Sequence, residues 1–348
     1  DWSERAGFAS AGTGWWTSIA AADFNGDGRI DYVVGNVGLN SIYTADPAHP
    51  SLLYYGDFRD GGPKQLVEGY YEGNTLYPRR SRRDLGAAIP SVLKRFPTYD
   101  SYARATLGQV VGEDKLAKAR RFAATELQSG VFLSQPDGTY RFEPLPHIAQ
   151  ISPLQGMVAG DFLGDGHMGV YAVQNSFAPI ISVGRIDGGL SQLLRGDGRG
   201  HFIAVPPVES GLVVPGDAKA LSVLDLDDDG WPDFLVTRNN DTTLLFHNKG
   251  AAGHKPLRIL LRGPAGNPTA VGARITVFFA DGSTETSEVY AGSGYYSQST
   301  PACFFGYPQA NPPRRIRVRW PSGPESEQDF PAGSTTLTLS NPPAAGKP

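Results

Sequence analysis

The chain has 348 residues, including 43 glycines and 28 prolines, and a formal net charge of -4. This composition favours many short strands joined by tight turns over long helices, and the aromatic content of 11% argues against disorder. The charge gives no reason to expect nucleic acid or an anionic membrane as a partner, and the single cysteine, Cys303, excludes an intramolecular disulfide framework.

No apolar run approaches the roughly 20 residues needed to cross a bilayer, so we expect no direct membrane span. The chain also shows no signal peptide. Because it starts at Asp1 and not at a methionine, we expect a processed product or a part of a longer protein.

The first distinctive element is the acidic segment DFNGDGRID at residues 23–31, here called the first loop. Weaker copies start at Asp57 and Asp161, and a complete copy, DLDDDGWPD, occupies residues 225–233 and is called the last loop. A small or apolar strand enters each loop and an apolar strand leaves it. Strand, loop and strand therefore recur four times within residues 1–250.

Residues 78–128 differ from the rest because they combine a basic run with helical apolar spacing. We expect two or three helices projecting from a β scaffold, with Thr98 and Glu113 as helix starts. The basic run is a candidate anion site for phosphate, sulfate or an acidic polymer, and a solvated face or a cap on nearby acidic residues is the alternative. Its arginines are Arg79, Arg80, Arg82 and Arg83.

The last part of the chain contains strand-like runs separated by Gly, Pro and Asn turns, without further acidic loops. We expect a separate small all-β domain at residues 255–340, joined through a Gly/Ala-rich linker. A disordered tail is predicted at residues 341–348.

Calcium prefers six to eight oxygen ligands, which a loop supplies from side chains at positions 1, 3, 5 and 9 and a backbone carbonyl at position 7. Both complete loops match this spacing and lack the position-12 glutamate of an EF-hand, so the sequence predicts two structural Ca²⁺ sites in β-hairpins. The alternative is that Asp, Asn and Gly merely favour turns. The predicted ligands are Asp23, Asn25, Asp27, Arg29 (carbonyl), Asp31, Asp225, Asp227, Asp229, Trp231 (carbonyl) and Asp233.

The two weaker copies lack side-chain ligands at positions 3 and 9. The third copy has Leu163 and Gly169 there, and the second has Arg59 and Gln65. We therefore expect neither copy to bind metal.

Sequence motifs for catalysis are missing: the chain has no G-x-S-x-G elbow, H-E-x-x-H, P-loop or Rossmann fingerprint. The interpretation favoured here is that the chain is not an enzyme. An active site assembled from distant carboxylates stays open. Scattered aromatic residues such as Trp15 and Tyr296 are candidates for stacking on sugars, with core packing as the alternative.

The acidic loops with their flanking strands resemble FG-GAP or VCBS repeats, the blade units of integrin-type β-propellers. The stretch NPTAVGARITVFFADG, followed by GSGYYSQS and VRWPSG, resembles the ASPIC/UnbV domain that accompanies these repeats in the cartilage acidic protein family and its bacterial secreted relatives. The resemblance implies an all-β fold: a β-propeller, complete or partial, with the helical insertion, followed by a β-sandwich-like domain. It also implies export to a calcium-rich extracytoplasmic place.

We therefore expect an exported calcium-binding propeller that acts as a scaffold for a protein or glycan partner. Residues 1–250, less the insertion, leave room for only about four blades. We therefore expect either the C-terminal portion of a longer propeller or a partial propeller that another polypeptide or a larger assembly completes. Two alternatives are a polysaccharide-acting enzyme, or its accessory subunit, with carboxylates in the propeller funnel, and an architectural subunit of a surface filament.

Overall fold

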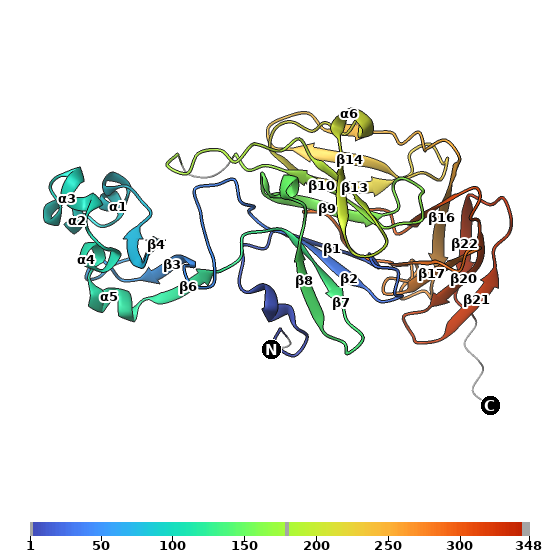
Figure 1. The fold of residues 1–348 in the computed structure, drawn as a ribbon, viewed down its shortest axis with the longest axis horizontal. Helices are drawn as coiled ribbons and strands as arrows, with labels where there is room; N and C mark the ends of the chain where they lie inside the picture. Colours follow the sequence, from blue (N-terminus) through green and yellow to red (C-terminus); the bar gives the residue numbers. More distant parts are fainter. Residues whose placement is uncertain (1–2, 178–180, 343–348) are drawn as a thin grey trace.

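The computed structural model describes residues 3–177 and 181–342, and most of its regular structure is β-strand (Figure 1). The expected all-β class is confirmed. Within the predicted tail, residues 343–348 lie outside the described residues. No helix in the described part of the chain is long and apolar enough to cross a bilayer.

Sheet 1 carries the first loop and has the antiparallel order β1-β2-β7-β8. Its strands are β1 (Ser18–Ala22), β2 (Asp31–Gly35), β7 (Gly130–Ser134) and β8 (Tyr140–Pro144). Residues 36–129 separate β2 from β7, so the chain leaves this sheet and later returns to it. The short 3-10 helix η1 (Phe8–Ala11) packs against β8, and η2 (His147–Gln150) follows it.

Two further sheets follow and carry the other loops of the scaffold. In both, the acidic loop connects the first two strands, as it does in sheet 1. Sheet 2 consists of β9 (Leu154–Gly160), β10 (Gly169–Gln174), β11 (Gln192–Gly196) and β12 (Phe202–Val205). Sheet 3 consists of β13 (Ala218–Leu224), β14 (Asp233–Arg238) and β15 (Leu244–Phe246), with the helical turn α6 (Pro207–Ser210) before it.

The excursion between β2 and β7, here called the inserted module, has its own sheet, its own helices and its own core, and it stands apart at the left of Figure 1. Its strands are β3 (Ser51–Gly56), β4 (Gln65–Glu72), β5 (Thr75–Pro78) and β6 (Arg120–Ala124). Its helices are α1 (Arg82–Ala88), α2 (Ser91–Arg95), α3 (Tyr99–Ala103), α4 (Leu107–Val111) and α5 (Glu113–Lys118).

The helical expectation for residues 78–128 is correct in kind but differs in number, because five short helices replace two or three. The predicted starts are confirmed: Thr98 caps α3 through a capping box, and α5 begins at Glu113 after Gly112, whose φ of 98° ends α4. Turn signals within the segment divide the apolar pattern into single turns and so account for the larger number.

The loop at Asp57 belongs to the inserted module and not to the repeated scaffold, contrary to the expectation of four equivalent scaffold units. It joins β3 to β4, whose sheet is completed by β5 and β6. The residues buried there, Leu52 and Val67 among them, pack with the helices of the module. Local sequence encodes a hairpin, but which strands pair with it depends on distant segments.

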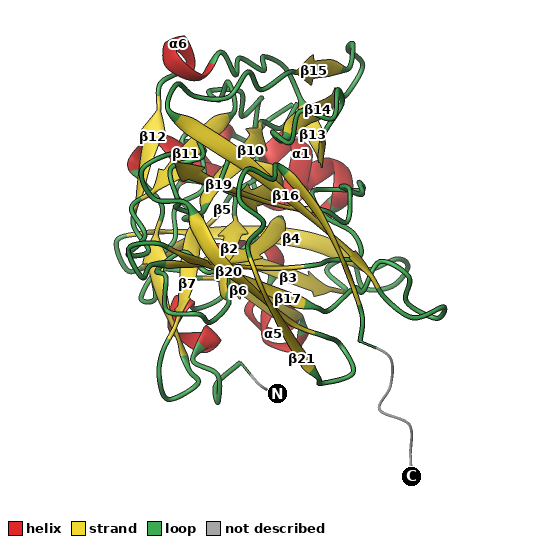
Figure 2. Cartoon of the chain, turned by 90° about the vertical axis from the view of Figure 1, so that its right-hand side faces the viewer, coloured by secondary structure: helices red, strands yellow, loops and turns green. Residues whose placement is uncertain are grey.

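The C-terminal sandwich has two sheets, β19-β16-β22 and β18-β17-β20-β21, and lies at the right of Figure 1. Its strands are β16 (His254–Arg262), β17 (Arg274–Phe279), β18 (Thr284–Glu288), β19 (Cys303–Pro308), β20 (Pro313–Arg319), β21 (Glu325–Asp329) and β22 (Thr336–Ser340). Alternating apolar residues such as Ile275 and Val277 are fully buried, which is the pattern of strands with one face in a core. Figure 2 views the molecule from this side.

Strands β1, β9 and β13 lie side by side, and the C-terminal sandwich packs against all three. The N–H of Asp23 donates to the carbonyl of Thr286 at 3.3 Å, the N–H of Thr300 donates to Val223 at 3.0 Å, and β19 contacts β9. One continuous apolar core joins sheets 1 and 2 to the sandwich.

Sheets 1, 2 and 3 therefore form an arc, and the described residues form no closed ring. In a closed propeller the inner strands surround a central channel. Here the same strands bury their surface against the sandwich, which gives the arc a packing partner without further blades.

Candidate metal centre

Three of the acidic loops share one hydrogen bond between their first and sixth residues. The N–H of the sixth residue, a glycine, donates to the carboxylate of the first residue: Gly28 to Asp23 at 2.7 Å, Gly166 to Asp161 at 2.9 Å and Gly230 to Asp225 at 3.0 Å. These glycines have φ values of 79°, 82° and 91°, in the left-handed region that side chains disfavour. The glycine in the motif is therefore required by the turn itself.

The residue at position 9 connects each complete loop to the third strand of its sheet, or to the residues directly after that strand. Asp31 accepts hydrogen bonds from the N–H of Phe24 at 2.9 Å and of Ser134 at 2.7 Å. Asp233 does the same with Leu226 and Asn248, each at 2.8 Å. Both carboxylates are at most 1% exposed, so they connect distant backbone segments whether or not a cation is bound.

The oxygens of the first loop already receive hydrogen bonds from within the loop. The N–H of Asp27 donates to Asp23 at 3.1 Å and to Asn25 at 3.2 Å. The carboxylate of Asp27 in turn accepts from the backbone and the guanidinium of Arg29. The guanidinium of Arg29 therefore pairs with Asp27, one of the predicted metal ligands. Only the backbone carbonyl of Arg29 is itself a predicted ligand.

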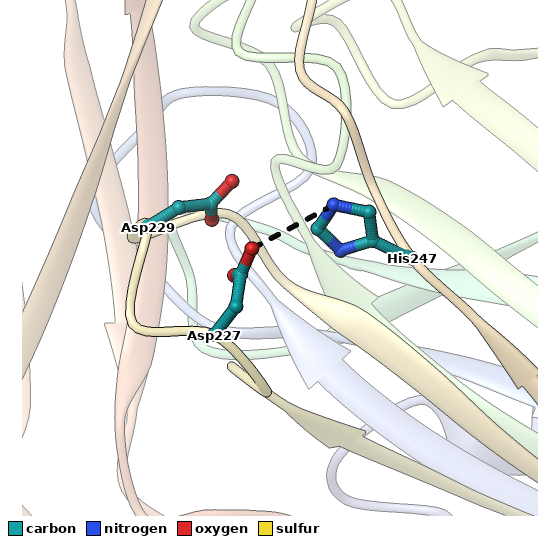
Figure 3. Close-up of side chains that lie close together, drawn as sticks. All are labelled: Asp227, Asp229 and His247. Atoms are coloured by element: carbon teal, nitrogen blue, oxygen red, sulfur yellow. Dashed lines mark ion pairs between the residues drawn. The ribbon is translucent and has the colours of Figure 1, made fainter.

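The last loop brings its carboxylates closer together. Ligand oxygens of Asp225, Asp227 and Asp233 lie within 4.8 Å of one another, and Asp227, Asp229 and His247 form a second such group (Figure 3). Among the described residues, both groups of three or more acidic, cysteine or histidine side chains at this spacing are formed by the last loop, one of them together with His247. Carboxylate oxygens are the ligands that Ca²⁺ prefers, and the group of Asp225, Asp227 and Asp233 would supply three of the six to eight that it needs.

One oxygen of the last loop needs a partner. Oδ1 of Asp225 is buried, and no described residue donates a hydrogen bond to it. Its other oxygen, Oδ2, faces the N–H of Gly230 and the guanidinium of Arg258 at 2.6 Å. An inaccessible carboxylate oxygen without a donor costs free energy, and a cation between Asp225, Asp227 and Asp233 would satisfy it.

Burial is the main electrostatic feature of these loops. It raises the pKa of Asp23 to about 6 and that of Asp161 to about 7, with neighbouring carboxylates adding to the effect and backbone N–H groups opposing it. Burial also raises the pKa of Asp31 and of Asp225. A divalent cation would favour the charged forms and reverse these shifts.

A basic side chain from another element contacts each of the two weaker loops. In the second loop, Lys115 donates to the carbonyl of Phe58 at 3.1 Å and pairs with Asp60 at 2.8 Å, while the amide of Gln65 accepts from Phe58 as Asp31 does from Phe24. In the third loop, Arg195 pairs with Asp165 at 2.5 Å.

Three of the four arginines in the basic run contact other parts of the protein. Arg80 pairs with Glu68 at 2.6 Å, Arg79 stacks on Tyr70 at 4.1 Å from the ring centroid, and Arg82 donates to the carbonyl of Phe96. Arg83 is exposed. Anion binding by this run stays a prediction.

Three cavities lie near the scaffold. One of about 250 Å³ lies between the inner strands and the sandwich, and Glu288, its only acidic lining residue, pairs with Arg274. A second, of about 390 Å³, is lined by Trp15, Tyr43 and Arg80 among others. The third, of about 400 Å³, has two acidic lining residues, and each is paired with a cation: Asp217 with Lys219 and Asp241 with Arg238.

Sequence reasoning identified the loop carboxylates but missed His247 and Arg258, which reach the last loop from β15 and β16. His247 lies 3.2 Å from Asp233 and 3.7 Å from Asp227. The sequence shows His247 only as a polar residue directly after a short strand. It shows Arg258 only as a polar residue that alternates with apolar residues along a strand. Neither pattern reveals a neighbour that is distant in sequence.

The fold and the loops define an all-β protein of repeated acidic hairpins with a terminal sandwich. The family described as "ASPIC and UnbV" matches residues 263–346, a range that includes most strands of the sandwich, which supports the expected C-terminal domain. FG-GAP and VCBS repeats are not shown by the comparisons.

No curated protein matches significantly. The crystal structure of the V. cholerae biofilm matrix protein Bap1 aligns with 91% of this chain at 11% identity and a TM-score of 0.17. The chain spans about half of that protein, 51%, and a similarity of this size supports no argument.

Proposed function

We propose that this protein is an exported, calcium-stabilised β scaffold whose surface binds a glycan or protein partner. The observation that carries the calcium part is the buried Oδ1 of Asp225, which lacks a hydrogen-bond donor among the described residues and lies in the group of Asp225, Asp227 and Asp233. The ion's role is structural, because it neutralises carboxylates that fasten one strand to the next.

Calorimetric titration of the chelator-treated protein tests this part. Wild-type protein is expected to bind Ca²⁺ and to melt at a higher temperature with it, and Asp227→Asn is expected to weaken both effects. Asp281→Asn is a matched control, since Asp281 is an exposed turn carboxylate that accepts from Ser283. Unchanged binding and melting in Asp227→Asn would refute a calcium site in the last loop.

The partner surface is proposed at the cavity of about 390 Å³ near the starts of β1 and β9. Trp15 is 39% exposed and packs edge-on against Tyr43, with ring centroids 4.5 Å apart. Arg80 and Gln155 also line this cavity. Aromatic faces beside hydrogen-bonding side chains suit a sugar ring, so a glycan is favoured over a protein partner.

A glycan array probed with the full chain tests this surface. Binding should be lost in Trp15→Ala and kept in Tyr296→Ala, because Tyr296 is 94% exposed and does not line the cavity. Glycan binding that survives Trp15→Ala would place the surface elsewhere.

The two ends of the arc, sheets 1 and 3, are where another polypeptide would add blades.

A further inference from the structure

Glu285 carries a carboxylate that is buried where the sandwich meets the scaffold. Glu285 lies on β18, the strand whose carbonyl at Thr286 accepts from the N–H of Asp23. Its residue exposure is 2%, and no described residue donates a hydrogen bond of normal geometry to either carboxylate oxygen. A buried carboxyl with two unsatisfied oxygens needs an explanation.

The surroundings of Glu285 are acidic. Burial and then the negative charges of Asp161, Asp165 and Asp23 raise its pKa well above the ordinary value, against a weaker opposing effect of the Gly306 N–H. Arg195 pairs with Asp165. The charged groups that act most strongly on Glu285 are therefore all carboxylates.

Gly306 on β19 shows how closely the two sides approach. A Cβ at this glycine would lie 2.8 Å from Oδ2 of Asp161 and 2.2 Å from the Cα of Gly164. Oδ2 of Asp161 thus faces the sandwich beside Gly306, and it accepts a hydrogen bond from the N–H of Gly166 at 2.9 Å. The third loop and Glu285 meet at the same glycine.

Neither protonation state of Glu285 is satisfied by the protein alone. The ionised form would place an uncompensated charge in the interior, and the protonated form would still leave the other carboxyl oxygen without a described donor. A bound cation would satisfy the carboxylate and the negative charges around it. A hard divalent cation prefers such oxygen ligands.

We propose that Glu285 and Asp161 bind a divalent cation, calcium, across the interface between the sandwich and the third loop. Glu285 supplies from another domain a carboxylate that the loop lacks, because positions 3 and 9 are Leu163 and Gly169. The ion holds the sandwich to sheet 2 and revises the expectation that this loop binds no metal.

The proposal rests on the same cation chemistry as the proposed function but on different residues. The test uses the full chain after chelation, with Glu285→Gln, Glu288→Gln and Asp227→Asn. Glu288 is the matched control because it lies on the same strand and pairs with Arg274 at 2.9 Å. Calcium equivalents are counted by calorimetry, and melting is followed with and without calcium.

Glu285→Gln is expected to bind one calcium equivalent fewer and to show a smaller calcium-induced rise in Tm. It should also melt above wild type in chelator, because a neutral amide replaces a buried carboxylate. Glu288→Gln should keep the wild-type number of equivalents. Hydrogen exchange at residues 161–166 and 284–288 should slow on calcium addition in wild type and change less in Glu285→Gln.

Unchanged equivalents and an unchanged calcium response in Glu285→Gln would overturn the interface site. If Asp227→Asn then still loses an equivalent, only the interface site fails. If Asp227→Asn is also unchanged, the calcium part of the proposed function fails with it. Should Glu285→Gln not fold, Asp161→Asn is measured in the same way from the other side of the interface.

Discussion

The first and last loops have the same ligand spacing but differ in which hydrogen bonds their oxygens receive. In the first loop, Asp23 and Asn25 accept hydrogen bonds from the N–H of Asp27, and the guanidinium of Arg29 forms an ion pair with the carboxylate of Asp27. In the last loop, the group around Asp225 includes a buried oxygen without a described donor. Matching a motif therefore does not establish equal affinity, because neighbouring N–H and basic groups compete with a cation for the same oxygens.

The largest expected effect concerns the buried position-9 carboxylate, which both loops have. Asp31→Asn and Asp233→Asn should each destabilise the chelator-treated protein by about 2–3 kcal/mol, because the new amide turns N–H groups toward a buried backbone donor. Urea unfolding measures the change, with Asp281→Asn as the exposed control. A silent Asp31→Asn would show that position 9 does not fasten the loop to Ser134.

The second prediction concerns pH. Because folding raises the pKa of Asp23 to about 6 and that of Asp161 to about 7 from 3.8, the folded state binds more protons than the unfolded state between about pH 4 and 7. Stability in chelator should therefore fall as pH rises through this window, and calcium should flatten the profile at its upper end. Melting scans from pH 5 to 8 measure both. A chelator profile that rises with pH would contradict the burial of these carboxylates.

The third prediction compares the two position-5 residues. Asp229→Asn should weaken calcium binding about tenfold, which is roughly 1.4 kcal/mol, whereas Asp27→Asn should change it about twofold because Arg29 already neutralises Asp27. Calorimetric titration of both variants gives the ratio. Equal losses would remove the distinction between the loops.

The smallest expected effect concerns the arginines that pair with the carboxylates of the first and last loops. Arg29→Gln should release Asp27 and strengthen terbium or calcium binding at the first loop about threefold. Arg258→Gln should act similarly on Asp225, with some loss of Tm, because Arg258 also connects the last loop to β16. A decrease in affinity in both variants would mean that these arginines order the loops for binding and do not compete with the ion.

Short-range features were predictable from sequence. The glycine turns, the strands around each loop, the cap at Thr98, the helix start at Glu113 and the all-β class depend on residues close together in the chain. The C-terminal strands were also readable, since alternating apolar residues such as Ile316 and Val318 lie on one buried face. Local propensity and periodicity are sufficient for these predictions.

Long-range partners were not predictable. The sequence could not show that β2 pairs with β7 across the inserted module, because strand pairing depends on which apolar faces meet after the chain folds. Nor could it show that Lys115 would occupy the second loop, as the helix that carries it lies more than fifty residues away from Phe58.

The sequence alone determined where carboxylates gather, because the acidic loop is a local turn written in nine consecutive residues. Only the tertiary structure decided what each loop faces: Arg29 at the first, Lys115 at the second, Glu285 near the third, and His247 with Arg258 at the last. The physical reason is that cation affinity depends on the balance of charge and hydrogen bonds within a few ångströms. That balance is set by strands and domains far apart in the chain.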